Sequence, residues 1–499
     1  MQTISSAIHW WGEDAPDQLA LAFGADRVTY RQLRDWSERV AASLIESGIE
    51  RGDRIGICAA NSMEYCVLIH GILRAGAIVS PLNMRYTPHE LEELLAETTP
   101  KIVFADETRR AQFGKLVSDV RALEDVRSLS SGARVKPGRD PLPDDPVVII
   151  ATSGSTAKPK GVVFTNRTMT TYASGWAIEM PHCPTKGSRV VVPAPLSTSA
   201  GFVQLIHYTT LGCTLFFESI FDPEVFLDIL VRERINGFGA VPLFFERIAD
   251  LPGFADADLS SIQVATTGGA PVTRALQDKW MAKGIVLQQI YGQTECGGNA
   301  TIMPRDLAAN YPEKCGRGSI FTELAIADSD GNFLPPGKVG QILMRGPSTM
   351  IGYWNNPDAT AEAIKNGWLH SGDLGVLDEN GLLTFVDRMK DIIISGGLNI
   401  SAAEVERAVL AFPGVEEAMV IAAKDKKFGE TPMAVLYARE DVDVPSLIAH
   451  CNEWLADYKV PRYVVVEREP MPRTATGKLA KPVMREKYKD AADTLARVR

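Results

Sequence analysis

Short apolar segments alternate with helical patterns through the first two thirds of the chain, and this alternation limits the fold more than any other feature. Strands are expected at residues 55–59, 76–81, 101–105, 189–193, 214–218, 262–267 and 286–291. Helical patterns lie between them, at residues 63–73 and 223–233 among others. Strands that alternate with helices form parallel sheets with helices on both faces. The sequence therefore predicts an α/β protein whose large N-terminal domain contains layered, parallel-rich sheets.

The C-terminal part of the chain has a different pattern. Strands are expected at residues 415–423, 433–438 and 462–467, a helix at 445–458, and another helix after Lys481. One apolar stripe of the expected helix consists of Leu447, Ile448, Cys451, Trp454, Leu455 and Tyr458. We expect a small α+β domain with its own core, so that the domains are residues 1–389 and 390–499. The segment 132–143, rich in Gly, Pro and charge, is expected to be an exposed linker.

Composition and cysteine content disfavour several classes of protein. Hydrophobic residues make up 45% of the 499 positions and charged residues 23%, which are values of a globular protein. A net charge of −10, spread without long runs, predicts no nucleic-acid partner. The 7 cysteines contain no C-x-x-C pair, which disfavours a disulfide framework or a zinc site and favours a reducing compartment.

The N-terminal residues lack the basic region of a signal peptide. The longest apolar stretch, residues 65–82, is interrupted by His70, Arg74 and Pro81, so we expect no integral membrane segment. The cytoplasm is the expected location. The oligomeric state is left open, a homodimer included.

The strongest chemical signal begins at Val147 and reads VVIIATSGSTAKPKGVVFT. An apolar strand leads into small and hydroxyl residues whose backbone N–H groups can approach phosphate oxygens, while Lys160 adds positive charge. It is not a Walker A loop, because Pro159 stands where that motif needs Gly and a strand follows instead of a helix. We interpret it as a phosphate-binding loop; a solvated β-hairpin loop is the alternative.

Residues 152–161, TSGSTAKPKG, resemble the phosphate-binding signature of the adenylate-forming superfamily. That superfamily includes acyl-CoA synthetases, coumarate–CoA ligases, firefly luciferase and peptide-synthetase adenylation domains. Further segments follow in the family's order: TGGAP (267–271), YGQTE (291–295), GWLHSGD (367–373), DRMKD (387–391), SGG (395–397) and PRTATGK (472–478). The match spans essentially the whole chain. Its length and the CGG at 296–298 are most similar to short bacterial fatty-acyl or aromatic acyl-CoA synthetases.

The resemblance implies an AMP-forming carboxylate–CoA ligase. A carboxylic acid and ATP would give an acyl-AMP and pyrophosphate, after which the CoA thiol would attack the acyl-AMP and release AMP. ATP and CoA are then co-substrates and Mg²⁺ is the cofactor. The small-molecule acid would be a medium- or long-chain, alicyclic or aromatic acid. The implied fold is that of adenylate-forming enzymes, with a small, mobile C-terminal domain that carries the catalytic lysine.

The resemblance also assigns roles to individual residues. The catalytic set is Lys478, Glu295, Thr294 and Lys160, with Glu295 as the ligand of Mg²⁺. The nucleotide set is Thr152, Ser153, Gly154, Ser155, Thr156, Lys160, Gly268, Gly269, Ala270, Pro271, Tyr291, Gly292, Thr294, Asp373 and Arg388. The CoA and hinge set is Lys390, Ser395, Gly396 and Gly397. The acyl-pocket set is Thr198, Gly201, Phe202, Val241, Gln293, Gly297 and Gly298.

Several of these residues have an ordinary structural alternative. Gly268 and Gly269 after a strand would let a planar base lie against the backbone, or would simply form a strand-to-helix turn. Tyr291 can stack on adenine or be a core aromatic residue. Asp373 can accept the ribose hydroxyls or form an Asx turn. Arg388 can bridge ribose and phosphate or form an exposed ion pair.

The chain departs from the family pattern in three informative places. After Gly397, Leu398, Ser401 and Ala402 stand at the usual acidic, Tyr and Pro positions. Ala157 replaces a usual Gly of the phosphate loop. Ser197 and Thr198 replace an aromatic–His pair that many fatty-acyl and aryl relatives carry between the nucleotide and the acyl pocket. This last change predicts either a wider or more polar acyl entrance, or a neutral change of packing.

Three other functions would use parts of the same sequence pattern. An amino-acid adenylation domain would place an Asp near Thr198, where this chain has no carboxylate. A luciferase-like monooxygenase would share the scaffold and is not excluded by any residue. A degenerate nucleotide-binding module is disfavoured because Lys160, Glu295, Asp373 and Lys478 are all retained. The identity of the acid stays open.

Overall fold

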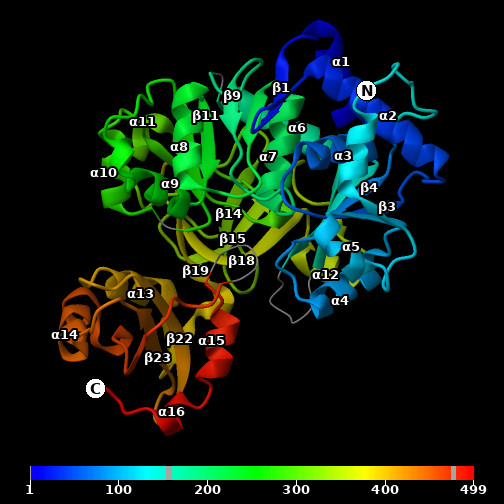
Figure 1. Ribbon diagram of the computed structural model, residues 1–499. Helices are drawn as coiled ribbons and strands as arrows, with labels where there is room; N and C mark the ends of the chain where they lie inside the picture. The colour runs from blue at the N-terminus through cyan, green and yellow to red at the C-terminus, as the bar shows by residue number, and fades with distance from the viewer. Residues whose placement is uncertain (1, 153–159, 181, 271, 474–478) are drawn as a thin grey trace. The chain divides into compact units, whose positions relative to one another are not determined.

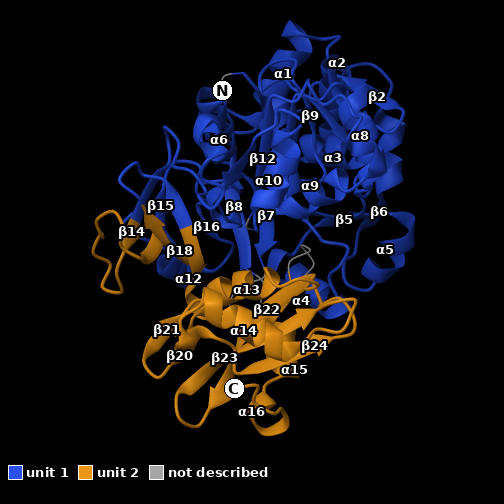
Figure 2. Cartoon of the chain, turned by 90° about the vertical axis from the view of Figure 1, so that its left-hand side faces the viewer, with its two compact units in different colours: residues 1–325, 343–371, 378–384 blue, residues 326–342, 372–377, 385–499 orange. Residues whose placement is uncertain are grey.

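The computed structural model describes residues 2–152, 160–180, 182–270, 272–473 and 479–499. Its contacts divide the chain into two compact units (Figure 2). The first comprises residues 1–325, 343–371 and 378–384, and the second comprises residues 326–342, 372–377 and 385–499. The unit boundary along the continuous chain thus falls at residue 385, a few residues before the expected domain boundary at 390. The division into functional domains at 389/390 stays a prediction.

The first unit contains a mostly parallel seven-stranded sheet in the order β13-β12-β11-β9-β10-β1-β2. Its strands are β13 (Leu287–Ile290), β12 (Val264–Gly268), β11 (Gly237–Ala240), β9 (Arg189–Val191), β10 (Thr214–Phe217), β1 (Leu19–Phe23) and β2 (Asp26–Thr29). Every neighbouring pair is parallel except β1 and β2. The parallel-rich sheet that the sequence predicts is therefore present.

Helices cover both faces of this sheet, as Figure 1 shows. Phe226, Phe245 and Trp280 bring α8 (Pro223–Arg232), α9 (Pro242–Ala249) and α10 (Arg274–Met281) into one core with Phe238 of β11 and Ala265 of β12. On the other side lie α6 (Asn166–Glu179) and α7 (Ser199–Thr210). Because side chains alternate along a strand, residues next to Phe238 and Ala265 point toward α7.

A second seven-stranded sheet of the same unit has the order β16-β8-β7-β4-β3-β5-β6. Its strands are β16 (Gly352–Tyr353), β8 (Lys160–Thr165), β7 (Pro146–Thr152), β4 (Ile78–Pro81), β3 (Arg54–Cys58), β5 (Ile102–Ala105) and β6 (Val120–Ala122). The strands from β7 to β6 run parallel, whereas β8 is antiparallel to both β7 and β16. The remaining N-terminal helices are α1 (Ile4–Asp14), α2 (Tyr30–Glu46), α3 (Met63–Arg74), α4 (Pro88–Thr98), α5 (Glu107–Phe113) and the 3-10 turn η1 (Leu123–Leu129).

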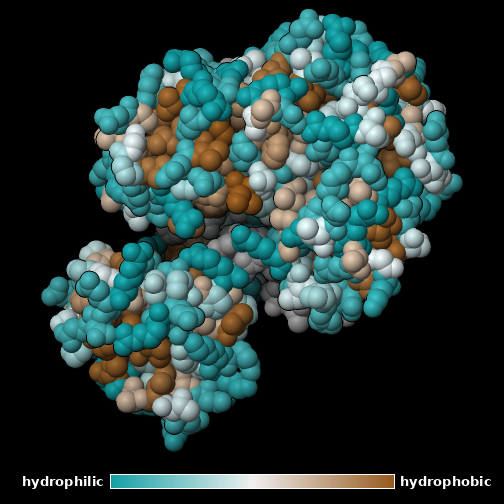
Figure 3. All heavy atoms as spheres, viewed as in Figure 1, coloured by the Kyte–Doolittle hydropathy of each residue, from teal (hydrophilic) through white to brown (hydrophobic). Residues whose placement is uncertain are grey.

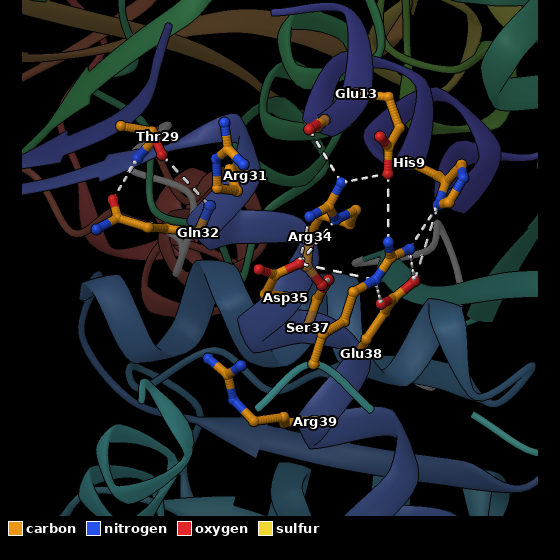
Figure 4. A network of polar contacts seen from close by, with 12 residues as sticks. His9, Glu13, Thr29, Arg31, Gln32, Arg34, Asp35, Ser37, Glu38 and Arg39 are labelled. Atoms are coloured by element: carbon orange, nitrogen blue, oxygen red, sulfur yellow. Dashed lines mark hydrogen bonds and ion pairs between the residues drawn. The ribbon is translucent and has the colours of Figure 1, made fainter. Parts of the chain in front are cut away.

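A network of charges joins α1 to α2 (Figure 4). Arg34 is buried, and its Nη1 donates to Glu13 Oε1 at 2.6 Å and to the Gly12 carbonyl at 2.9 Å. Glu38, also buried, accepts from Arg134 Nε at 2.7 Å. Arg134 lies in the exposed segment 132–143, which this contact ties to α2. The segment is an exposed loop, as expected, but it lies within the first unit and is not a linker between the two units.

A third sheet, β14-β15-β18-β17 with β19 beside β18, is divided between the two units. Its strands are β14 (Glu323–Ala327), β15 (Gly340–Arg345), β17 (Ile364–Lys365), β18 (Trp368–Leu377) and β19 (Leu383–Arg388). The remaining short helices of the first unit are η2 (Pro252–Phe254), η3 (Thr294–Cys296), α11 (Arg305–Ala308) and α12 (Pro357–Ala363).

The rest of the second unit is an α+β fold, as predicted for the C-terminal part of the chain. Its sheet, β21-β20-β23-β22 with β24 parallel to β23, contains β20 (Ile393–Ser395), β21 (Leu398–Ile400), β22 (Glu417–Asp425), β23 (Gly429–Tyr437) and β24 (Tyr463–Glu467). Its helices are η4 (Met389–Asp391), α13 (Ala402–Leu410), α14 (Val444–Trp454), η5 (Asp457–Lys459), α15 (Lys481–Lys487) and α16 (Ala491–Thr494).

One detail of the predicted C-terminal helix is wrong. The helix expected at 445–458 ends at Trp454, because Leu455 is extended and a separate 3-10 turn follows. Trp454 is 62% exposed and lies beside His450, so it is not part of the apolar stripe. Leu447, Cys451 and Leu455 do enter the core.

The face of the molecule in Figure 3 is mostly hydrophilic and the cysteines are free thiols, as the composition and the cysteine spacing predict. Hydrophilic side chains cover most of the face shown in Figure 3, and hydrophobic ones are scattered among them. Within the described ranges, every helix is too short or too polar to cross a bilayer. All seven cysteines are buried free thiols. Burial raises the pKa of the Cys58 and Cys296 thiols to about 12.

Candidate active site

The expected phosphate loop connects two antiparallel strands of the second sheet. β7 ends at Thr152 and β8 begins at Lys160, and these two residues are partners in the register. Thr152 Oγ1 donates to the Lys160 carbonyl at 3.3 Å. Ser153, Gly154, Ser155 and Thr156 lie outside the described residues. The strands on both sides of this segment are therefore as predicted, and its role in binding phosphate stays a prediction.

Lys160 belongs to a cluster with Tyr353 and Glu295. Its Nζ lies 5.1 Å from the centroid of the Tyr353 ring, at a distance suited to a cation–π contact. Tyr353 is in β16, which pairs with β8, and its hydroxyl donates to Glu295 Oε1 at 3.0 Å. Burial and then the Glu295 charge raise the pKa of Tyr353 above its ordinary value. The phenol therefore stays protonated and orients the carboxylate.

Two turns follow neighbouring strands at one edge of the first sheet. Gly268 ends β12 and is the register partner of Ile290, the last residue of β13. Tyr291 follows directly and is buried. Because the two strands are parallel, their turns meet at the carboxyl edge, where ligands bind in α/β sheets. The structure thus brings the predicted nucleotide residues Gly268, Gly269 and Tyr291 together. Ala270 is exposed beside them, and Pro271 lies outside the described residues.

The turn after Tyr291 is tightly packed. A Cβ at Gly292 would lie 2.0 Å from the Gly298 carbonyl oxygen, so that only glycine fits there. Thr294 and Glu295 begin the 3-10 turn η3, which Gly297 ends. Gln293 precedes η3, and Tyr172 of α6 lies 3.4 Å from the Cβ position of Gly297. This packing fixes the backbone that presents Thr294 and Glu295.

The other expected acyl-pocket residues come from two helix starts. Thr198 is the N-cap of α7: its Oγ1 accepts from the Gly201 N–H at 3.3 Å and donates to the Pro195 carbonyl at 2.7 Å. Phe202 is fully buried in the first turn of α7. Val241 is 39% exposed and precedes α9. The structure therefore gives Thr198 a capping role, which the sequence reasoning did not assign. No contact with an acid is shown for any of them.

Within the second unit, Asp373 of β18 and Arg388 of β19 form an ion pair, with Arg388 Nε 3.7 Å from Asp373 Oδ1. Asp387 is buried and accepts from the Ser401 hydroxyl at 2.7 Å and the Ala403 N–H at 3.0 Å, so it holds the start of α13. Lys390 lies in η4, where burial and then the Arg388 charge lower the pKa of its amine.

The expected CoA loop is the turn of a hairpin between β20 and β21. Ser395 and Leu398 are register partners, so Gly396 and Gly397 form a two-residue loop. Their φ values are 58° and 83°, and positive φ at both central positions is what a type I′ turn requires. Lys478 lies outside the described residues. The described residues before and after it are joined by a hydrogen bond, in which the Ala480 N–H donates to the Pro472 carbonyl at 2.8 Å.

Tyr353 is the residue that sequence reasoning missed. It lies in the segment GYW at 352–354, which contains no charged residue and is 58 positions from Glu295 in the sequence. Only the antiparallel pairing of β16 with β8 brings it to the site. The only feature of the sequence that could have drawn attention to Tyr353 is that it follows a glycine.

Known proteins match the chain over nearly its whole length. Residues 8–354 match the family model described as AMP-binding enzyme, and residues 404–478 match the AMP-binding enzyme C-terminal domain. Long-chain-fatty-acid–CoA ligase FadD13 of Mycobacterium tuberculosis is 34% identical over 480 residues, which cover 93% of each chain. Feruloyl-CoA synthase of an Amycolatopsis species is 34% identical over 95% of this chain and 96% of its own. A methyl-dioxo-octahydroindenyl-propanoyl:CoA ligase of Mycobacterium tuberculosis is 33% identical over 97% of this chain and 99% of its own.

Solved structures of related enzymes also match the chain over nearly its whole length. A fatty acyl-CoA synthetase of Mycobacterium tuberculosis has a TM-score of 0.80 at 31% identity, covering 98% of this chain and 99% of its own. O-succinylbenzoate–CoA synthetase of Bacillus subtilis, in complex with ATP and a magnesium ion, has a TM-score of 0.87 at 28% identity, covering 95% of this chain and 98% of its own. The resemblance seen in the sequence motifs is thereby confirmed. The chain belongs to the AMP-binding enzyme family and is an AMP-forming acyl-CoA ligase of that family.

Proposed function

We propose that this ligase activates a medium- or long-chain, alicyclic or aromatic carboxylic acid at the carboxyl edge of β12 and β13, and passes the acyl group to CoA. The observation that carries the proposal is the Lys160–Tyr353–Glu295 cluster. One cation and one oriented carboxylate lie together, at the start of β8 and in the turn after β13. These are the charges that a reaction between two anions requires.

In the first half-reaction the acid needs no general base, because a carboxylate is ionised at pH 7. Attack on the α-phosphorus brings two negative groups together, so the main requirement is electrostatic stabilisation. Lys160 supplies positive charge toward the leaving pyrophosphate, and Thr152 and Thr294 supply hydroxyl groups. Tyr353 holds the Glu295 carboxylate in one orientation.

The residues present fit a magnesium ion that arrives with ATP. Glu295 offers hard carboxylate oxygen, and the described part of the chain contains no group of three His, Cys, Asp or Glu residues suited to a resident metal. Mg²⁺ in nucleotide sites is typically held by one or two carboxylates together with substrate phosphates. Glu295 would hold it, and when bound the ion neutralises charge on the phosphate oxygens.

In the second half-reaction the CoA thiol attacks the acyl-AMP carbonyl and AMP leaves. Asp373 is proposed to bind the ribose hydroxyls, with Arg388 close enough to orient its carboxylate. Lys390 is proposed as the hinge of a small domain comprising residues 390–499. The loop of Ser395, Gly396 and Gly397 would then line the path of the pantetheine arm. The seven buried free thiols support a reducing location such as the cytoplasm.

The test separates the two half-reactions. A panel of carboxylic acids is screened by ATP–pyrophosphate exchange and then by CoA-dependent thioester formation, each with and without Mg²⁺. We expect exchange with a subset of acids, dependent on Mg²⁺, and thioester formation with the same acids. Exchange without any thioester would show that CoA is not the acceptor. Absence of exchange with every acid would contradict the proposed site.

A further inference from the structure

The face of the first sheet that points toward α7 carries polar side chains in one row. Gly239 of β11 is the register partner of Thr266 in β12, and Thr266 is the partner of Gln288 in β13. Phe238 and Ala265, next to them in the chain, belong to the core on the opposite face. Thr266 and Gly268 therefore share the α7 face with Gly239 and Gln288.

This face runs along β12 from the nucleotide turn toward the start of the strand. Gly268, Thr266 and Val264 lie in line along β12, and two residues of a strand span about 7 Å. A cavity of about 670 Å³ opens at the far end, lined among others by Val264, Gln288, Ile302 and Arg317. Its volume is typical of small-molecule sites, which measure roughly 300–1,000 Å³. An acyl group whose carboxylate reacts near Gly268 would extend over Thr266 toward this cavity.

Three polar atoms surround one point of this path. A Cβ built on Gly239 lies 2.9 Å from Thr266 Oγ1, 3.9 Å from Gln204 Nε2 and 3.9 Å from Tyr208 Oη. Gln204 and Tyr208 are one turn apart on α7, so they project from the same side of the helix. Gln204 Oε1 is buried and has no hydrogen-bond partner among the described residues. A buried amide oxygen left without a partner is unfavourable unless a ligand or water completes it.

The groups around this point are uncharged. Gln204, Thr266 and Tyr208 offer amide and hydroxyl groups, and His207 packs against Tyr208 with 4.9 Å between ring centroids. Burial lowers the pKa of His207 to about 3, so its ring is neutral at pH 7. The unpartnered Gln204 Oε1 requires a donor, so these groups suit a hydroxyl group, which can donate to that oxygen and accept from a neighbouring N–H or O–H. A second carboxylate in such a place would lose its hydration without a counter-charge.

We propose that Gln204, Thr266 and Tyr208 bind a hydroxyl group of the acyl group, about 7 Å from the reacting carboxylate. The substrate class is then a hydroxylated acid, such as a ring alcohol bearing a short carboxylic side chain, in preference to a plain hydrocarbon acid. This inference rests on the proposed function, because it places the acyl group on the α7 face of the sheet. Gln204 is its specificity-determining residue.

A comparison of matched acids tests this inference. The ratio of kcat/KM is measured for 3-(4-hydroxycyclohexyl)propanoate against 3-cyclohexylpropanoate, and 3-(4-carboxycyclohexyl)propanoate is measured as a third acid. Since a site built for a polar group discriminates against the analogue that lacks it, we expect the wild-type enzyme to prefer the alcohol by about tenfold or more. Gln204→Leu and Thr266→Val should each reduce this ratio toward one, with the KM for ATP unchanged.

Gln277→Leu is the matched control. Gln277 is also buried with an unpartnered amide, but it lies on α10, which packs against the opposite face. Its substitution should leave the ratio unchanged. A wild-type preference for 3-cyclohexylpropanoate or for the dicarboxylic acid would overturn the inference, as would an equal ratio in wild type and both variants. If ATP–pyrophosphate exchange occurs with no acid at all, the proposed function itself fails and this inference fails with it.

Discussion

At the scale of single residues, the candidate site depends on contacts between side chains that are distant in the sequence. Tyr353 touches Lys160 through its ring and Glu295 through its hydroxyl. The lysine and the glutamate could be predicted from the sequence, because each lies in a segment with an unusual composition. The tyrosine could not, since nothing in GYW indicates its partners. The partners of Tyr353 depend on the pairing of β16 with β8, which is a property of the tertiary fold.

Tyr353→Phe removes the hydroxyl and keeps the ring. Because a hydrogen bond to a charged group contributes about 1.5–3 kcal/mol, we expect acyl-AMP formation to fall by roughly 10- to 100-fold. The Mg²⁺ concentration needed for half-maximal ATP–pyrophosphate exchange should rise. Tyr311→Phe is the control, because Lys314 lies 4.7 Å from the centroid of the exposed Tyr311 ring in a comparable lysine–tyrosine contact. Equal effects of the two substitutions would show that the Glu295 contact is unimportant.

His70 gives a prediction about pH. It is buried in α3, neither ring nitrogen has a partner among the described residues, and burial lowers the pKa of its ring to about 4. The unfolded chain binds this proton near pH 6.5, so the contribution of His70 to stability is complete above that pH and is lost as the pH falls toward 4. The loss at pH 4 is on the order of 3 kcal/mol.

His70→Leu should therefore move the midpoint of acid unfolding, followed by tryptophan fluorescence, to lower pH. His89→Gln is the control, because the His89 side chain is 80% exposed. If the two variants unfold at the same pH as the wild-type protein, the buried histidine does not limit acid stability.

At the scale of elements, most strands and helices could be predicted from the period of apolar residues. The strand expected at 101–105 is β5, and the helix expected at 63–73 is α3; each is a mostly apolar segment that is buried along nearly its whole length. Helix ends were less predictable. The apolar stripe continues past Trp454, yet the backbone turns there, since Leu455 reaches the core from an extended conformation. The capping role of Thr198 could not be predicted either, because the start of α7 at Ser199 is known only from the structure.

Thr198 caps α7, the helix that carries Gln204 and Tyr208, and this changes what substitutions at that position mean. Thr198→Ala should cost about 1 kcal/mol of stability, the usual loss for an N-cap, whereas Thr198→Ser should cost little. Thr198→His loses the same cap and adds bulk. We expect it to lower activity on large acids relative to small ones beyond the change seen in Thr198→Ala. Equal substrate profiles for the His and Ala variants would show that position 198 does not face the acid.

At the scale of the whole molecule, the residues with proposed roles are divided between the two units. Lys160, Tyr291, Glu295 and Tyr353 belong to the first, whereas Asp373, Arg388 and the proposed CoA loop, residues 395–397, belong to the second. The chain from Asp387 to Asp391 is anchored at both ends within the second unit: Asp387 holds α13, and Asp391 accepts from Arg485 at 2.7 Å. Lys390, the proposed hinge, lies between these two residues.

The last prediction is that the two half-reactions need different residues of the C-terminal domain. Lys478 is expected to stabilise attack of the carboxylate on ATP, and it would then occupy space that the pantetheine thiol must cross. Lys478→Ala should cut acyl-AMP formation by on the order of a hundredfold or more, as loss of one transition-state donor does. Thioester formation from supplied acyl-AMP and CoA should survive. Lys424→Ala, at an exposed position of β22, should change neither step.

Lys390→Pro should have the opposite effect. Proline fixes φ near about −65°, which would restrict the backbone change that a hinge at this position requires. We expect the CoA step to slow more than acyl-AMP formation, measured by single-turnover kinetics of each half-reaction. Because proline can also disturb η4 locally, Lys390→Ala serves as the comparison: it removes the amine and keeps the backbone free, so it should retain the CoA step. If Lys478→Ala and Lys390→Pro slowed both half-reactions equally, the alternation of the domain between two positions would be wrong for this protein.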